Sequence, residues 1–143
     1  MTLVLDASSV VDILLQTDRG LQLDYGLSQR ADEDMLTVAH LDAEVLSALA
    51  RAHHAGEIEA KDVTTSLRDL NDMALTRMPI GGELLESAWE LRHNVYAKDA
   101  LYVALAQELR AELVTTDDRL ARAVPELVAR LDSPNGVDPP TFR

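Results

Sequence analysis

Four acidic side chains are placed where they could bind divalent metal together: Asp6, Glu44, Asp99 and Asp117. Asp6 follows Leu3-Val4-Leu5, and Asp117 follows Leu113-Val114-Thr115-Thr116. Short apolar runs bounded by polar residues predict buried strands. Glu44 and Asp99 lie near the expected starts of apolar helices. Each acid alone is explained by the preference of helix N-termini for negative charge, which is worth ~0.3–1 kcal/mol.

The elements that would position these acids alternate along the chain. Strands are expected at 3–5, 35–39, 112–116 and, more weakly, 76–80, where Pro79 favours a sheet edge or a strand end. Helices are expected at 10–15, 21–30, 40–54, 58–74, 84–91, 99–110 and 117–124, and residues 126–131 fit either a strand or a helical turn. Ser8 or Ser9 is the expected N-cap of the first helix.

This alternation predicts an α/β fold with three layers, in which helices flank a central parallel sheet. The two consecutive helices between Met35 and Thr76 predict a helical hairpin that projects from the sheet. Parallel strands end at one sheet edge, so three of the four acids are expected to converge there, joined by Glu44. Buried carboxylates must be paired or metal-bound, and an all-oxygen site suits Mg²⁺ or Mn²⁺.

Composition limits the remaining possibilities. The 143 residues predict a single domain over 1–132 and an irregular tail over 133–143. No cysteine is present, so disulfides, zinc-thiolate sites and thiol catalysis are excluded, which fits a cytoplasmic protein. We expect no secretory signal and no membrane span. The net charge of −12 argues against nucleic-acid binding through bulk positive charge.

The four acids lie in segments that together resemble PIN-domain ribonucleases. These segments are Val4-Leu5-Asp6-Ala7-Ser8, residues 41–49 around Glu44, residues 98–106 around Asp99, and residues 113–120 around Asp117. They follow the order of the family's four motifs, and the chain length and early start resemble the VapC toxins of bacterial toxin–antitoxin pairs.

The resemblance implies a metal-dependent endoribonuclease with Asp6, Glu44, Asp99 and Asp117 as catalytic and metal-binding acids. Ser8, Thr115 and Asp118 are candidates to line the site, although an exposed helix-start acid is the preferred interpretation of Asp118. Arg92, His93 and Lys98 are candidate RNA contacts or simply a solvated charged turn. The implied partners are RNA and a VapB-like antitoxin, which would lay a segment on an apolar groove of the hairpin and direct an Arg toward the acids. The resemblance also implies that the protein forms a homodimer, and that it forms a heterotetramer or larger assembly with the antitoxin.

Other interpretations compete with this one. A haloacid dehalogenase-like enzyme would need a second Asp where Ser8 stands, and a response-regulator receiver would need neighbouring acids after the first strand. A catalytically silent PIN-fold module that only binds its antitoxin remains open. Trp89 and Tyr102 are expected in the core or an interface, Asp12 is expected to face solvent, and Asp42 is expected to cap a helix or face solvent. The four histidines are expected to be surface or partly buried residues.

Overall fold

The computed structural model describes residues 1–134. Its centre is a parallel sheet in the order β3-β2-β1-β4, formed by β1 (Thr2–Leu5), β2 (Asp34–Val38), β3 (Thr76–Met78) and β4 (Glu112–Val114). All four predicted strands are present, and β3 lies at the edge, as Pro79 indicated. In the central strand, Val4 is in register with Leu36 of β2 and Leu113 of β4.

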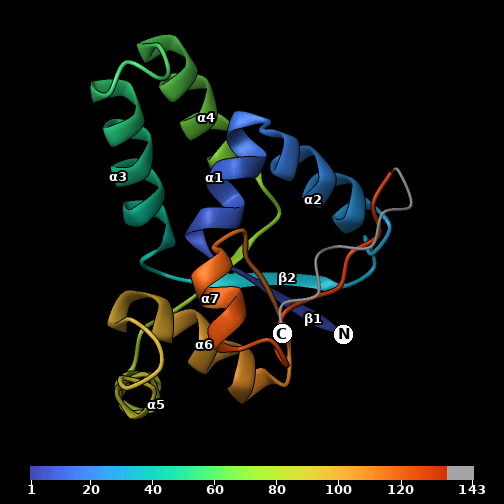
Figure 1. Cartoon of the computed structure of the whole chain (residues 1–143), viewed down its shortest axis with the longest axis vertical. Coiled ribbons are helices and arrows are strands. Elements are labelled where there is room, and N and C mark those ends of the chain that lie inside the picture. The colour runs from blue at the N-terminus through green and yellow to red at the C-terminus, as the bar shows by residue number, and fades with distance from the viewer. Residues whose placement is uncertain (135–143) are drawn as a thin grey trace.

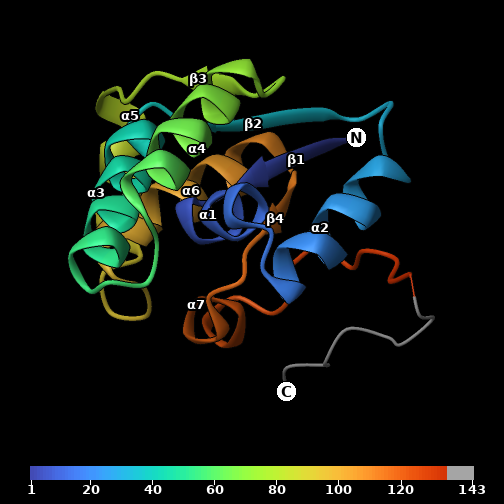
Figure 2. The ribbon, with the colours of Figure 1, turned by 90° about the horizontal axis from the view of Figure 1, so that it is seen from above.

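Seven helices connect and cover these strands. They are α1 (Ala7–Leu15), α2 (Asp18–Ser28), α3 (Leu41–His54), α4 (Ala60–Asp72), α5 (Gly82–Glu90), α6 (Ala97–Leu109) and α7 (Asp118–Ala123). The predicted three-layer α/β arrangement is confirmed. Helices α1 to α4 lie on one side of the sheet, while α5 and α6 lie on the other (Figures 1 and 2). Helices α3 and α4 form the predicted hairpin (Figure 1).

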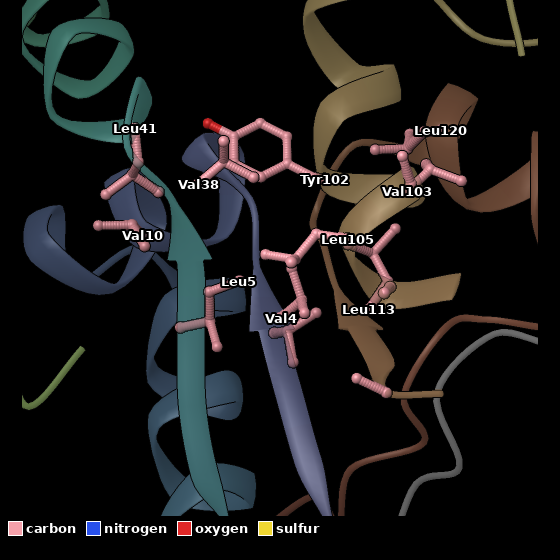
Figure 3. Close-up of a cluster of buried hydrophobic side chains, with 14 of the residues drawn as sticks. Val4, Leu5, Val10, Val38, Leu41, Tyr102, Val103, Leu105, Leu113 and Leu120 are labelled. Atoms are coloured by element: carbon pink, nitrogen blue, oxygen red, sulfur yellow. The ribbon is translucent and has the colours of Figure 1, made fainter. Parts of the chain in front are cut away.

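The sheet core is apolar on both faces, as expected for parallel strands covered by two helical layers. Leu3, Val4 and Leu5 are completely buried. Figure 3 shows Val4 and Leu5 packed among residues from β2, β4 and the surrounding helices. Helix α6 has six buried residues, Ala100 and Tyr102 to Ala106, more than any other described helix, which agrees with its apolar sequence.

The apolar stripes of the hairpin are used mostly inside the molecule, which leaves less apolar surface for the expected partner helix. Leu41, Val45 and Leu49 of α3 are fully buried, and Leu70 of α4 is 5% exposed. Leu46 is the one large hydrophobic side chain of the described hairpin that is strongly exposed. The reason is tertiary: α3 and α4 both pack against α1 as well as against each other.

Helix α1 contacts α2 closely through backbone. A Cβ on the buried Gly20 would lie 1.8 Å from the carbonyl oxygen of Asp12, so only glycine fits at this crossing. The prediction that Asp12 faces solvent is wrong. Its Oδ1 accepts a hydrogen bond of 2.8 Å from Thr17, and its Oδ2 accepts one of 2.5 Å from Thr116.

The segment after α7 resolves the ambiguity at residues 126–131. Val128 forms a single parallel bridge with Leu113 after a turn, through hydrogen bonds that flank it at Leu127 and Ala129. Of the predicted tail, residues 135–143 lie outside the described residues. Within residues 1–134, no helix combines the length and apolar character needed to span a membrane.

Candidate active site

Asp6 is the buried acid at the carboxyl end of the central strand. It is 2% exposed and serves as the N-cap of α1, accepting from the backbone N–H of Ser9 at 2.9 Å. The structure therefore assigns to Asp6 the capping role expected of Ser8 or Ser9. Because burial removes water from the carboxylate, the pKa of Asp6 rises from 3.8 to about 6, although hydrogen bonds from Thr115, Ser9 and Ser8 oppose the rise.

Hydroxyl groups tie Asp6 to the end of β4. Thr115 Oγ1 donates to Asp6 Oδ2 at 2.5 Å, and Ser8 Oγ lies 2.8 and 2.9 Å from the two carboxylate oxygens. These hydroxyls are held in turn, because the backbone N–H of Thr116 donates to Ser8 and that of Asp117 donates to Thr115. The carboxyl ends of β1 and β4 thus form one network.

Glu44, in the first turn of α3, is oriented by two aromatic neighbours. Its Oε1 accepts from the Tyr102 hydroxyl at 3.0 Å and lies 2.6 Å from His40 Nε2. His40 Nε2 also lies 3.1 Å from the Lys98 carbonyl, so this nitrogen must carry a proton to donate to its acceptors. The imidazole is stacked on the Tyr102 ring at 4.7 Å.

This arrangement shifts the ionisation of the cluster. Burial opposes ionisation of Glu44, but its contacts with His40 and Tyr102 and the charge of Lys98 together outweigh burial and lower the pKa of the carboxyl. Burial likewise opposes protonation of His40, yet the adjacent Glu44 raises the imidazole pKa. Each of the two groups thus favours the charged form of the other, and in the described part of the chain no hydrogen bond reaches Glu44 Oε2.

Asp99 and Asp117 complete the acidic edge. Burial raises the pKa of Asp99, and the negative charges of Asp117 and Glu44 raise it further, while Lys98 partly offsets them. No residue among 1–134 donates a hydrogen bond to the Asp99 carboxylate. Asp117 caps α7 by accepting from the backbone N–H groups of Arg119 and Leu120 at 2.9 and 3.2 Å. All four predicted acids therefore lie at the same sheet edge.

The donor set fits a hard divalent cation in its chemistry. The oxygens of Asp99 and the Oε2 atom of Glu44 accept no hydrogen bond from the described residues, so water or a cation must satisfy their lone pairs. The negative charges of Glu44 and Asp117 also repel that of Asp99, which a bound cation would relieve. In the described conformation, however, no three His, Asp or Glu side chains are grouped so that they could hold an ion by themselves. Asp6, Glu44 and Asp117 each accept hydrogen bonds from protein donors in this conformation.

The remaining candidates divide into two groups. Asp118 pairs with Arg19 at 2.8 Å, with both side chains about half exposed. Arg92 and His93 line a cavity that Asp99 also lines, and the charge of Lys98 acts on both Asp99 and Glu44. Asp42, expected to cap a helix or face solvent, is about half exposed and also forms a two-pronged ion pair with Arg77 at 2.8 Å.

Sequence reasoning missed the role of His40. The spacing of His40 and Glu44, four residues apart at the start of a helix, is the signal that would have indicated their contact. Tyr102 is buried as expected. Trp89, expected in the core or an interface, is 64% exposed and therefore lies outside the core.

Residues 3–125 match the PIN domain family, a span that holds all four acids and their supporting hydroxyls. The chain belongs to this family. The resemblance inferred from the four motifs is thus confirmed. Among PIN-domain relatives, Ribonuclease VapC3 of Mycobacterium tuberculosis is 43% identical over 123 residues, which cover 85% of this chain and 87% of the relative.

Further relatives give the same family. Ribonuclease VapC1 of Mycobacterium tuberculosis is 41% identical over 121 residues, covering 84% of this chain and 89% of the relative. Ribonuclease VapC3 of Pyrobaculum aerophilum is 30% identical over 131 residues, covering 90% and 98%. The crystal structure of Mycobacterium tuberculosis VapC20, a sarcin-ricin loop cleaving toxin, aligns with a TM-score of 0.60 over 83% of this chain and 93% of that one. At 16% identity, it supports the PIN fold alone.

Proposed function

We propose that this protein is a divalent-metal-dependent endoribonuclease and the toxin of a type II toxin–antitoxin pair. The observation that carries the proposal is the acidic edge, where Asp99 has no hydrogen-bond donor and lies within the fields of Glu44 and Asp117. Names of relatives at 38–43% identity support the ribonuclease activity. The metal is Mg²⁺ or Mn²⁺, since both prefer carboxylate oxygen.

Asp6, Glu44, Asp99 and Asp117 would hold the metal, which when bound neutralises phosphate charge and lowers the pKa of a water nucleophile. The other residues position these acids. Tyr102 and His40 fix Glu44 through Oε1 and leave Oε2 available. Ser8 and Thr115 hold the Asp6 carboxylate by hydrogen bonds at the carboxyl end of β1. Lys98 places a positive charge beside the acids, where the negatively charged phosphodiester must approach.

Asp99→Asn tests this assignment. The substitution keeps the shape of the side chain and removes one negative ligand without breaking a hydrogen bond of the described structure. We expect at least ~100-fold slower cleavage of RNA, comparable to the loss of one strong electrostatic contact, together with weaker Mn²⁺ binding by titration. Asp118→Asn, in the outward-facing ion pair, is the matched control and should retain activity. A folded Asp99→Asn protein with full metal-dependent activity would remove Asp99 from the site.

A silent antitoxin-binding module is the second candidate. It is favoured by the finding that no three metal-binding side chains within residues 1–134 are grouped to hold an ion. Isothermal titration of the wild-type protein with Mn²⁺, paired with a cleavage assay under the same conditions, separates the two candidates. An absence of both binding and cleavage would select the silent module.

We further propose that a VapB-like antitoxin holds the nuclease inactive in the cytoplasm by directing an Arg toward the four acids, whose carboxylates match a guanidinium in charge and geometry. Replacement of that Arg by Ala should restore cleavage within the complex. The toxin would be a two-fold dimer, assembling with antitoxin into a heterotetramer or larger complex. The domain would span 1–132.

A further inference from the structure

A cavity of about 530 Å³ adjoins the acidic edge on the side of α5 and α7. Asp99 lines it, together with two aromatic residues, Trp89 at the end of α5 and Tyr96 just before α6. Both rings are strongly exposed, Trp89 at 64% and Tyr96 at 60%. Large apolar rings in water are costly, and here they open onto the same hollow as an acid of the proposed active site.

An arginine guanidinium lies over each of the two rings. The Arg92 guanidinium lies 4.6 Å from the centre of the Trp89 ring, and that of Arg119 lies 5.1 Å from the centre of the Tyr96 ring. Arg119 is fixed there, because its Nη1 donates to the Tyr96 hydroxyl at 2.7 Å. The cavity wall therefore presents two arginine–aromatic pairs rather than a purely apolar lining.

The charge of these two arginines is not neutralised by the protein. Arg19, Arg30 and Arg77 each pair with a carboxylate. Neither Arg92 nor Arg119 forms an ion pair with any described residue. In a chain with 25 acidic residues and a net charge of −12, this is a local cationic wall that suits a ligand with negative charge and flat rings.

We propose that this cavity is a nucleobase subsite, in which a base of single-stranded RNA adjacent to the scissile phosphate stacks on Trp89 or Tyr96. The inference rests on the proposed nuclease function. Arg92 and Arg119 contact the neighbouring phosphates or extend the stack through their guanidinium planes, since both arrangements are common for unpaired RNA. Because Asp99 also lines the cavity, the RNA backbone that carries a base bound here would pass the acids.

Trp89 is the chain's single tryptophan, so its fluorescence reports on this site alone. The test titrates wild-type protein in EDTA with a short single-stranded RNA and with an abasic oligonucleotide of equal length and charge. Stacking predicts that the RNA quenches Trp89 fluorescence and that the abasic chain does not. If neither RNA nor abasic chain quenches, or both quench equally, the base subsite is refuted.

Variants test the ring itself, with binding followed by the anisotropy of labelled RNA. Trp89→Leu keeps apolar bulk and should weaken binding at least about five-fold, as expected for the loss of one stacked base, while Trp89→Phe keeps a ring and should lose less. The abasic chain should bind Trp89→Leu as it binds wild type. Leu21→Ala, an exposed position on α2 outside the cavity lining, is the control and should leave binding unchanged.

The main competing occupant is a second copy of this chain. Light scattering decides, because a self-interface predicts that Trp89→Leu turns a dimer into a monomer without a base-dependent loss of RNA affinity, and this outcome overturns the subsite. Cleavage by the wild-type protein in Mn²⁺ is measured separately. Cleavage without base-dependent quenching refutes the subsite and leaves the function standing, whereas base-dependent quenching without cleavage refutes the function and leaves the subsite standing.

Discussion

Ionised Asp6 should destabilise the metal-free protein, so Asp6→Asn should raise stability at neutral pH. The same substitution should abolish cleavage, because it removes a proposed metal ligand. The carboxyl is 2% exposed, and burial lifts its pKa from 3.8 to about 6. That difference, at 1.36 kcal/mol per pH unit, corresponds to about 3 kcal/mol. Because the side chain is shielded from solvent, screening by water does not reduce this free energy.

The direction in which stability changes with pH follows from proton uptake at Asp6. Between pH 3.8 and about 6 the folded protein binds more protons at Asp6 than the unfolded chain does. Stability at this residue is therefore lost as the pH rises through that window, and the full penalty is present above it. An Asn at position 6 can still cap α1 through its Oδ1 and has no charge to desolvate.

The assay is urea unfolding of wild type and Asp6→Asn in EDTA, at about pH 4 and about pH 8. The difference in unfolding free energy between the two proteins should move by up to about 3 kcal/mol in favour of the variant at the higher pH. Any constant cost of rearranged hydrogen bonds at Ser8 and Thr115 cancels in this comparison. A difference that is the same at both pH values would refute the reasoning. Added Mn²⁺ should stabilise wild type and not the variant.

Three further outcomes are expected. Gly20→Ala should cost at least about 2 kcal/mol in urea unfolding, because its Cβ meets the Asp12 carbonyl, whereas Gly82→Ala, with open space around it, should not destabilise. The pKa of Glu33 is lowered by its hydrogen bond from Arg30, so this pair stabilises the fold above pH 4.5 and the contribution is lost as pH falls below it; Glu33→Gln should flatten that part of the pH–stability curve. Light scattering at micromolar concentration should give a dimer, and a monomer alone would contradict the proposed assembly.

The fold was predictable because its elements are periodic and its strands are continuous apolar runs. Leu3-Val4-Leu5 can be buried on both sides only in a covered parallel sheet, and that one feature indicates the position of Asp6. Convergence of the acids then follows from strand direction. Boundaries were less certain: β4 ends at Val114, two residues early, because Thr115 and Thr116 turn their hydroxyls toward Asp6 and Asp12.

What sequence could not supply was the set of contacts between distant elements. Asp12 stands in an apolar helix, and its partial burial follows from its hydrogen bond with Thr116 and from the close crossing at Gly20. Trp89 sits beside an apolar stripe, yet its exposure depends on how α5 packs on α6. The hairpin stripes were correctly read as apolar, but their burial against α1 was not apparent from periodicity.

The hydrogen bond from Thr115 to Asp6 joins residues separated by 109 positions in the chain. It has a consequence for synthesis. The ribosome makes β1 first, but β1 acquires its β4 neighbour, and Asp6 its threonine donor, only when nearly the whole domain has been translated. A nascent or prematurely terminated chain that lacks residues 112–117 has neither the second half of the network nor Asp117. Translation itself therefore delays assembly of the acidic edge until the last strand is complete, and a fragment released early has no such edge.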